Sequence, residues 1–218
     1  MALALFDLDN TLIGGDSDHL WGEFLADNNR VDAEAHRIQN DIFYQKYRQG
    51  TLDIQAFLKF SLEPLSRYPL TTLKTWHTEF MSQYIKPVML PKAFELLDKH
   101  RLRGDTLIII TATNDFVTQP IADALDVPHL LATSAEKKQN RYTGKVLGTP
   151  CFQEGKITRL NNWLRENPHT MENSFFYSDS FNDLPLLNRV THPTAVDPDL
   201  RLKTHAQKNN WPVISLRT

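Results

Sequence analysis

The 218-residue sequence predicts an α/β protein with a doubly wound, mostly parallel sheet and an inserted α-helical bundle. In residues 88–218, short apolar runs that end in polar clusters alternate with amphipathic stretches, as strands alternate with helices in such a sheet. In residues 14–87, amphipathic stretches follow one another without a strand pattern between them, which is typical of a helical bundle. We therefore expect an α/β core formed by residues 1–13 and 88–218, and a helical cap formed by residues 14–87.

The first apolar run, residues 3–6, predicts a buried central strand that ends in two carboxylates, Asp7 and Asp9. Alternate residues of a strand share a side, so these carboxylates leave the strand end close together. Ligands bind at this edge of open α/β sheets. Because desolvated like charges repel, the pair favours a divalent cation or a shared proton. A solvated loop explains the pair equally well when it is taken alone.

The cap has a predicted helix at each amphipathic stretch. These helices run over residues 16–28 with Asp16 or Ser17 as cap, over 32–50 with Asp32 as cap, from Asp53 with an interruption at Pro64, and from Thr71 or Thr72 to before Pro87. Helices inserted directly after reactive carboxylates can close over a site and exclude water. The alternative is that they only enlarge the core.

The remaining elements are predicted from the same patterns. Expected strands cover residues 106–110, 129–133, 174–177, 194–196 as a late edge strand, and 213–215, with a hairpin over 137–148; expected helices cover 91–104 and 116–125 and begin at 155, 183 and 199. Thr111 then lies at a strand end before a helix N-terminus, where it could bind an anion or serve as a cap. Lys156 opposes the helix dipole unless it faces a phosphate or carboxylates.

Together these residues resemble the four motifs of the haloacid dehalogenase (HAD) superfamily. The motifs, in order, are Asp7-Leu-Asp9-Asn-Thr11, Thr111 after an Ile-rich strand, Lys156, and Asp179-Ser-Phe-Asn182-Asp183. The insertion is similar to the C1-type helical cap of the phosphoserine-phosphatase-like branch, subfamily IB. The segment Gly-Gly-Asp-Ser-Asp-His-Leu-Trp21 is similar to a bacterial subgroup with histidinol-phosphate phosphatases among its members. This resemblance implies a Rossmann-like core with the strand before Asp7 at its centre.

The resemblance also implies a reaction, the hydrolysis of a phosphomonoester with Mg²⁺ through an aspartyl-phosphate. It makes Asp7 the nucleophile and Asp9 the acid and base, a carboxylate that dehalogenases of the family lack. Thr11 would position their loop. The implied metal ligands are Asp7, Asp9 through its backbone carbonyl, Asp179 and Asp183; the implied phosphate or substrate contacts are Thr111, Ala112, Lys156, Asn182, Asp16 and Trp21.

The substrate is less constrained. Thr111-Ala-Thr and Ser178-Asp-Ser180 replace the Ser-Gly-Gly and Gly-Asp-Gly usual in phosphoserine phosphatases, which leaves specificity for phosphoserine open. A cationic amino-alcohol phosphate such as histidinol phosphate would suit Asp16, Asp18 and Trp21, although Trp21 could equally be a core residue. A phosphoserine phosphatase, a broad-specificity phosphatase and an inactive HAD ligand-binding protein are the alternatives. Length and motif order exclude a signalling receiver domain.

Composition adds expectations about partners and location. A net charge of −2 gives no reason to expect a nucleic-acid partner, and no apolar run reaches the roughly 18 residues of a membrane helix. The predicted strand at residue 3 follows no leader-like segment, and Cys151, the single cysteine, is expected to be a buried or loop thiol. We therefore expect a cytoplasmic monomer or homodimer that binds a small phosphate ester.

Overall fold

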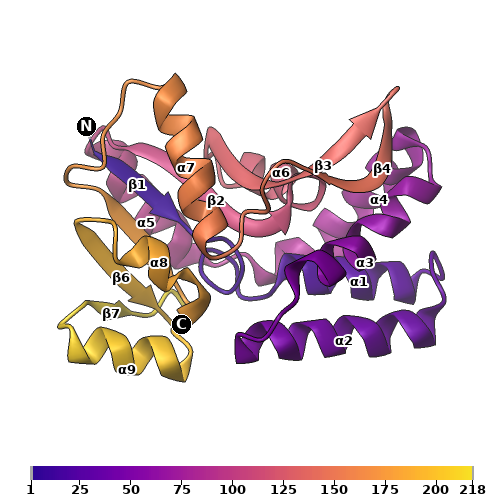
Figure 1. Ribbon diagram of the computed structural model, residues 1–218, viewed down its shortest axis with the longest axis horizontal. Coiled ribbons are helices and arrows are strands. Elements are labelled where there is room, and N and C mark those ends of the chain that lie inside the picture. Colours follow the sequence, from indigo (N-terminus) through magenta and orange to yellow (C-terminus); the bar gives the residue numbers. More distant parts are fainter. Residues whose placement is uncertain (1, 218) are drawn as a thin grey trace.

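The computed structural model describes residues 2–217, which form a seven-stranded sheet with helices on both faces (Figure 1). Its strand order is β4-β3-β2-β1-β5-β6-β7, and all neighbouring strands are parallel except β3 and β4. The strands are β1 Leu3–Phe6, β2 Thr106–Asn114, β3 His129–Lys138, β4 Arg141–Leu147, β5 Phe175–Ser178, β6 His192–Val196 and β7 Val213–Ile214. The predicted fold class is confirmed. Late edge strands were expected over both 194–196 and 213–215; β7 does lie at the edge, whereas the prediction for β6 is wrong, because β6 lies between β5 and β7.

The register of the central strands brings their carboxyl ends to one level. In β1, Phe6 pairs with Ile109 of β2 on one side and with Tyr177 of β5 on the other. The next N–H, that of Asp7, donates to the Tyr177 carbonyl at 2.9 Å. The polar residues that follow β1, β2 and β5 therefore meet at one edge of the sheet.

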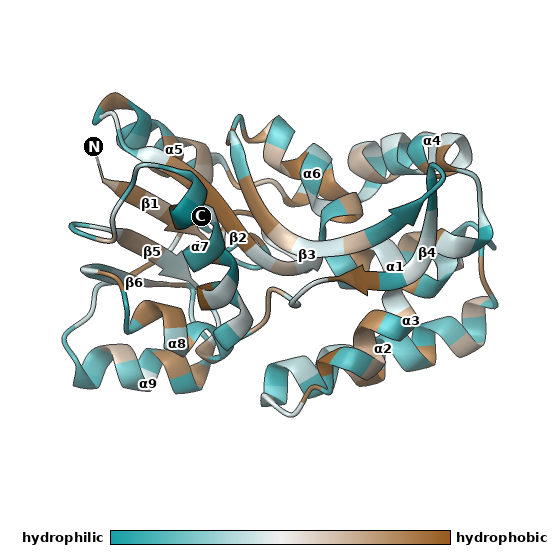
Figure 2. Cartoon of the chain, turned by 45° about the horizontal axis from the view of Figure 1, so that its top comes forward, coloured by the Kyte–Doolittle hydropathy of each residue, from teal (hydrophilic) through white to brown (hydrophobic). Residues whose placement is uncertain are grey.

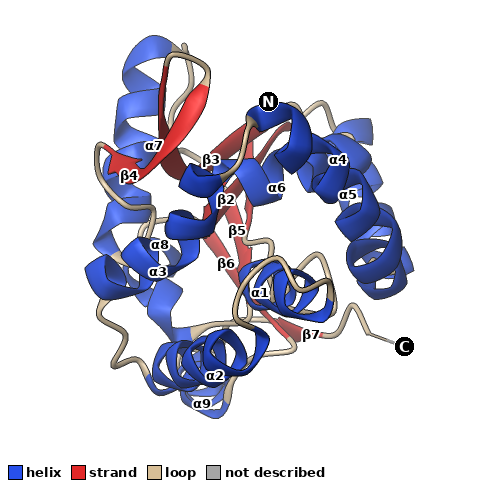
Figure 3. Cartoon of the chain, turned by 90° about the vertical axis from the view of Figure 1, so that its right-hand side faces the viewer, coloured by secondary structure: helices blue, strands red, loops and turns tan. Residues whose placement is uncertain are grey.

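The sheet is buried on both faces, as a parallel sheet must be. Its helices are α1 Ser17–Asp27, α2 Ala33–Gln49, α3 Ile54–Arg67, α4 Leu70–Phe80, α5 Pro91–Leu102, α6 Asp115–Ala124, α7 Glu154–Glu166, α8 Leu184–Leu187 and α9 Leu200–Lys208, with a π-helix Met81–Ile85 and 3-10 turns Lys86–Val88 and Phe181–Asp183. Ala4 and Phe6 face one apolar cluster, which includes α5 and α6, whereas Leu3 and Leu5 face another, which includes α7, α8 and α9. Figure 2 shows the apolar central strands, and Figure 3 shows the helices on either side.

The helices of the predicted cap begin where the sequence indicates. The side chains of Asp16, Asp32 and Asp53 accept backbone N–H groups at the starts of α1, α2 and α3. The predicted interruption at Pro64 is wrong, because α3 continues through it to Arg67. Proline removes one helical hydrogen bond. Here the side chains of Pro64 and its neighbours Leu62 and Leu65 are buried, and their packing holds the helix together.

Strand β3 is longer than the sequence suggests. It pairs with β2 as far as Thr133 and then continues into the antiparallel hairpin with β4, so the predicted strand and hairpin are one element. The hairpin turns at Gln139 and Asn140, both with positive φ, and its Gly144 lies against Ser66 of α3. The division into core and cap stays a prediction. No helix within residues 2–217 has both the length and the apolar character needed to cross a bilayer.

Candidate active site

A tight turn after β1 folds Thr11 back towards the sheet edge. The N–H groups of Thr11, Leu12 and Ile13 all point at the Leu8 carbonyl, at 3.3, 2.9 and 3.2 Å. The Thr11 hydroxyl lies 3.5 Å from Asp7 Oδ2 and 3.2 Å from Asp179 Oδ1, and it accepts the Asp179 N–H at 3.0 Å. This one side chain therefore joins the loop after β1 to the loop after β5.

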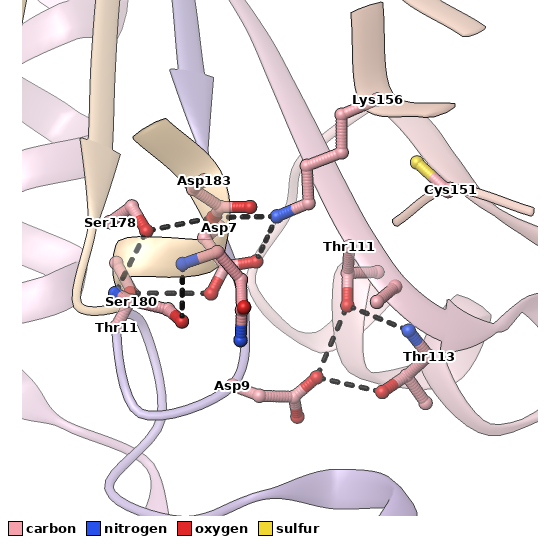
Figure 4. Close-up of polar contacts among 12 residues, drawn as sticks. Asp7, Asp9, Thr11, Thr111, Thr113, Cys151, Lys156, Ser178, Ser180 and Asp183 are labelled. Atoms are coloured by element: carbon pink, nitrogen blue, oxygen red, sulfur yellow. Dashed lines mark hydrogen bonds and ion pairs between the residues drawn. The ribbon is translucent and has the colours of Figure 1, made fainter. Parts of the chain in front are cut away.

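Lys156 enters the same edge from the first turn of α7. Gly155 allows this approach, because a Cβ at that position would lie 1.9 Å from the Pro150 carbonyl oxygen. The Lys156 Nζ donates to Asp7 Oδ1 and to Asp183 Oδ2, each at 2.7 Å, and the residue is 2% exposed (Figure 4). The Ser178 hydroxyl donates to the same Asp183 oxygen at 2.7 Å.

The site carries more negative than positive charge. Burial would lower the pKa of Lys156, but the carboxylates of Asp183 and Asp7 outweigh it and raise that pKa, so the lysine stays charged. Burial raises the pKa of Asp7 to about 7, opposed by Lys156 and assisted by Asp183 and Asp9. Burial and the charges of Asp7 and Asp183 raise the pKa of Asp179 well above its usual value. Three carboxylates and one lysine leave excess negative charge at the site. A divalent cation that prefers hard oxygen ligands could neutralise this charge.

Asp9 points away from this cluster. Its Oδ1 accepts the Ser17 N–H at 2.6 Å, and its Oδ2 accepts the hydroxyls of Thr111 at 3.1 Å and Thr113 at 2.8 Å (Figure 4). The residue is 8% exposed. Asp9 bonds to none of Asp7, Asp179, Asp183 and Lys156, and its carboxyl group can carry a proton to or from a reacting oxygen.

A partly open cavity of about 40 Å³ lies over Asp7 and Asp9. Thr111 and Ala112 of β2 also line it. The predicted cap supplies most of its other walls, with two carboxylates, a histidine, an asparagine and a set of aromatic and aliphatic side chains: Asp16, Asp18, His19, Asn40, Phe43, Tyr44, Tyr47, Leu52, Ile54 and Phe57. Among the described residues that line this cavity, none is Lys or Arg.

Two of the predicted contacts lie elsewhere. Trp21 is 2% exposed and lies within 5.5 Å of three rings, stacked on Phe24 and edge-on to Phe80 and Phe116, so it lies in the core, the alternative given for it, and not among the residues that line the cavity. Its place on the apolar stripe of α1 turns it into the core. Asn182 donates from Nδ2 to the Tyr47 carbonyl at 3.1 Å, which links the loop after β5 to α2. Phosphate binding by Asn182 stays a prediction.

The structure adds functional side chains that sequence reasoning missed. The side chain of Asn114 caps α6, which leaves the Thr113 hydroxyl free to donate to Asp9. Ser178 directly precedes Asp179, and this adjacency was the available signal. No sequence signal marks Tyr47, because its position over the site depends on how α2 packs. Cys151 is fully buried, and burial raises its pKa to about 12, which leaves it inert.

Comparisons with known proteins agree with this geometry. The family model of haloacid dehalogenase-like hydrolases matches residues 4–188. A histidinol-phosphatase from Neisseria meningitidis serogroup C (strain 8013) is 45% identical over 219 residues, 99% of each chain. The crystal structure of a protein of unknown function from Bordetella pertussis Tohama I is 43% identical, with a TM-score of 0.93 over 99% of this chain and 98% of the other. A phosphoserine phosphatase structure at 17% identity, with a TM-score of 0.71 over 99% and 93%, shares the fold.

Proposed function

Because the chain belongs to the haloacid dehalogenase-like hydrolases and is a phosphatase of that family, we propose that it hydrolyses a small amino-alcohol phosphate with the help of Mg²⁺. Histidinol phosphate is the first candidate substrate, given the 45% identical relative that carries that name. The observation that carries the mechanism is that two neighbouring carboxylates have different hydrogen-bond partners. Asp7 is paired with Lys156 at 2.7 Å, while Asp9 is held apart by two threonine hydroxyls.

In the proposed reaction an Asp7 oxygen bonds to phosphorus as the bond from phosphorus to the ester oxygen breaks. The departing oxygen takes its proton from Asp9 and leaves as the alcohol. Asp9 then accepts a proton from the water that attacks the aspartyl-phosphate, which releases phosphate and restores both carboxyl groups. Lys156 contributes fixed positive charge beside Asp7, where phosphate charge accumulates.

The metal would be held by the carboxylates of Asp7 and Asp179 and the backbone carbonyl of Asp9, with Asp183 as a further ligand, directly or through water. When bound, Mg²⁺ would neutralise the repulsion between the Asp7 carboxylate and the phosphate. The excess of buried carboxylates over cations supports this assignment. Burial and the neighbouring carboxylates raise the pKa values of Asp7 and Asp179, and a bound cation would lower these values again by favouring the charged forms.

The cavity favours an amine over a carboxylate in the substrate. Asp16 and Asp18 line it, and none of its described lining residues is Lys or Arg, so the carboxylate of phosphoserine would meet two carboxylates and, as the one basic side chain among those residues, the imidazole of His19. Aromatic side chains such as Phe43 and Tyr44 could pack on an imidazole ring.

The test is phosphate release from a panel of esters, with and without Mg²⁺. We expect histidinol phosphate to exceed phosphoserine by at least about 100-fold in kcat/KM, or about 2.7 kcal/mol. EDTA should abolish the reaction, and Asp7→Asn should remove essentially all turnover. Asp98→Asn, which removes a carboxylate that is 62% exposed, is the matched control and should change little. Activity that survives in Asp7→Asn would refute the mechanism, and wild-type protein inert towards every ester would leave a ligand-binding protein.

A further inference from the structure

We propose that the hydroxyl of Tyr47, on helix α2, donates a hydrogen bond to the phosphoryl group of the substrate, and that Asn182 positions this tyrosine. The proposal rests on the proposed function and deepens it, because it adds a donor from α2 to the catalytic edge of the sheet. It also gives Asn182 a role that acts through Tyr47, in place of the direct phosphate contact that the family resemblance implies.

Tyr47 lies in the walls of two cavities that the clustered carboxylates border. One is the cavity of about 40 Å³ over Asp7 and Asp9. The other is a larger, partly open cavity beside Asp179 and Ser180. A side chain shared by both walls lies over the space that a phosphoryl group on Asp7 would enter.

The Tyr47 hydroxyl faces a negatively charged site and keeps its proton there. Tyrosine is protonated at neutral pH. Burial and the charges of Asp7, Asp179 and Asp183 raise the pKa of Tyr47 further above its usual range. A protonated phenol donates one hydrogen bond. It therefore offers a donor to a phosphoryl oxygen without adding negative charge to the site.

The backbone of α2 is attached to the sheet edge at the same residue. The Tyr47 carbonyl accepts a hydrogen bond from Asn182 Nδ2 at 3.1 Å, and Asn182 Oδ1 accepts one from Gln153 Nε2 at 3.4 Å. Both ends of the Asn182 amide are therefore engaged, and Asn182 is not among the described residues that line the cavity over Asp7. The amide holds the end of α2, and with it Tyr47, against the loop after β5.

A second bond fixes the same end of α2. Arg201 Nη1 of α9 donates to the Gln49 carbonyl at 3.4 Å. Gly50, with φ 73°, allows this approach, because a Cβ there would lie 2.8 Å from Arg201 Nη1 and 3.6 Å from Asn182 Oδ1. The last carbonyls of a helix lack partners further along it. Here two donors from the sheet side of the molecule bond such carbonyls and so fix where Tyr47 lies.

The phosphoryl group has more oxygens than the sheet edge has uncommitted donors. Its charge is spread over three oxygens during transfer. The Lys156 ammonium already donates to two carboxylates. The Thr111 hydroxyl already donates to Asp9 at 3.1 Å. A donor on α2 supplements them and is in place only while α2 is bound to the sheet edge, so it joins catalysis to the closed arrangement.

The first experiment removes the hydroxyl and keeps the ring. For Tyr47→Phe with Mg²⁺, we expect kcat/KM to fall by about 100-fold, the effect of losing one donor to a developing negative charge. The fall should agree within about threefold for histidinol phosphate and an aryl phosphate, because the contact is to the group that both esters share. Tyr84→Phe is the matched control. Its phenol bonds Asp27 in an exposed contact, and its loss should leave kcat/KM unchanged.

Binding of orthovanadate provides a readout that does not need turnover. Vanadate takes up the five-coordinate geometry of phosphoryl transfer, so contacts to the transition state also strengthen its binding. In calorimetry with Mg²⁺, we expect Tyr47→Phe to bind vanadate about 100-fold more weakly than the wild type, in line with its loss of kcat/KM. Tyr84→Phe should bind it like the wild type.

A double-mutant cycle separates positioning by Asn182 from a direct contact with phosphate. Asn182→Ala should lower kcat/KM of the wild type by about tenfold, the effect of one lost hydrogen bond. In the Tyr47→Phe background the same substitution should cost less than about threefold, because the hydroxyl through which Asn182 acts is already gone. Urea unfolding shows whether each variant folds, and Tyr47→Met replaces the phenylalanine variant if that one does not.

Three results would overturn the proposal. Tyr47→Phe could keep both kcat/KM and vanadate affinity within about threefold of the wild type, its loss could be confined to one ester, or the losses of the two substitutions could multiply. Wild-type protein that hydrolyses no ester refutes the proposed function itself. In that event the vanadate comparison still decides whether the Tyr47 hydroxyl contacts a phosphoryl-like group.

Discussion

Replacing Lys156 by methionine removes one partner from a buried three-residue ion network. The Nζ lies 2.7 Å from both Asp7 Oδ1 and Asp183 Oδ2, and all three residues are at most 3% exposed. Breaking such a network from one side costs about 3–5 kcal/mol, because the remaining charges stay buried without a counterion. A proton can relieve part of this cost, since the pKa of Asp7 is already raised to about 7. We therefore expect Lys156→Met to lose ~3 kcal/mol of unfolding free energy at pH 8.

The assay is urea unfolding in EDTA, with Lys138→Met as the matched control. Lys138 is 72% exposed and pairs with Glu136 at the surface, so its loss should cost less than about 1 kcal/mol. Removing Lys156 raises the folded pKa of Asp7 further above its unfolded value of 3.8, so the variant gains a stabilising proton at higher pH than the wild type does, and the loss should shrink as pH falls towards about 7. When Mg²⁺ at about 100 times its Kd replaces EDTA, the free energy of unfolding of any variant that binds the metal should rise by about 2.7 kcal/mol. A loss equal to that of the control would refute the ion-network argument.

Three further predictions test the acid, the core and a histidine. Asp9→Asn should lower kcat by about 10²–10⁴ for alkyl phosphates and much less for aryl phosphates, because aryl leaving groups need no proton from an acid. Equal losses for both kinds of ester would contradict the role of Asp9 as the acid. Trp21→Ala should cost about 3–5 kcal/mol in unfolding and leave the ratio of activity on histidinol phosphate to activity on phosphoserine unchanged, whereas a changed ratio would place the indole in the cavity. Burial holds the pKa of His100 below 6.5 in the folded state, so the free energy of unfolding should fall as pH drops below about 6.5 towards the folded pKa. His100→Gln should reduce this dependence of stability on pH, whereas His192→Gln, at an exposed position, should leave it unchanged.

The catalytic end of the sheet could be predicted because backbone pairing fixes it. Once β1 lies between β2 and β5, the residues after each strand must converge, whatever the loops do. The apolar runs predicted the strands, and the resemblance to the HAD motifs placed the strand before Asp7 between those that carry Thr111 and Asp179. Strand β2 continues past the predicted end at residue 110, so Thr111 lies within it. The length of β3 could not be predicted, since its second half pairs with β4 and packs against α3, a contact between distant parts of the chain.

For the predicted cap, the sequence does not distinguish the residues that line the cavity from those that lie in the core. Asp18 and Trp21 are three residues apart on α1 and so are neighbours on its surface, yet one lines the cavity and the other lies in the core. No local pattern separates them, because the boundary between cavity and core is set by Phe43 and Phe57, which α2 and α3 bring from far along the chain. Catalytic groups on strand ends are positioned by regular hydrogen bonding, whereas groups that read the substrate are positioned by side-chain packing. The unpaired Asp18 oxygen becomes visible only after that packing is known, because no local pattern in the sequence shows which buried polar atoms the folded cap leaves without a partner.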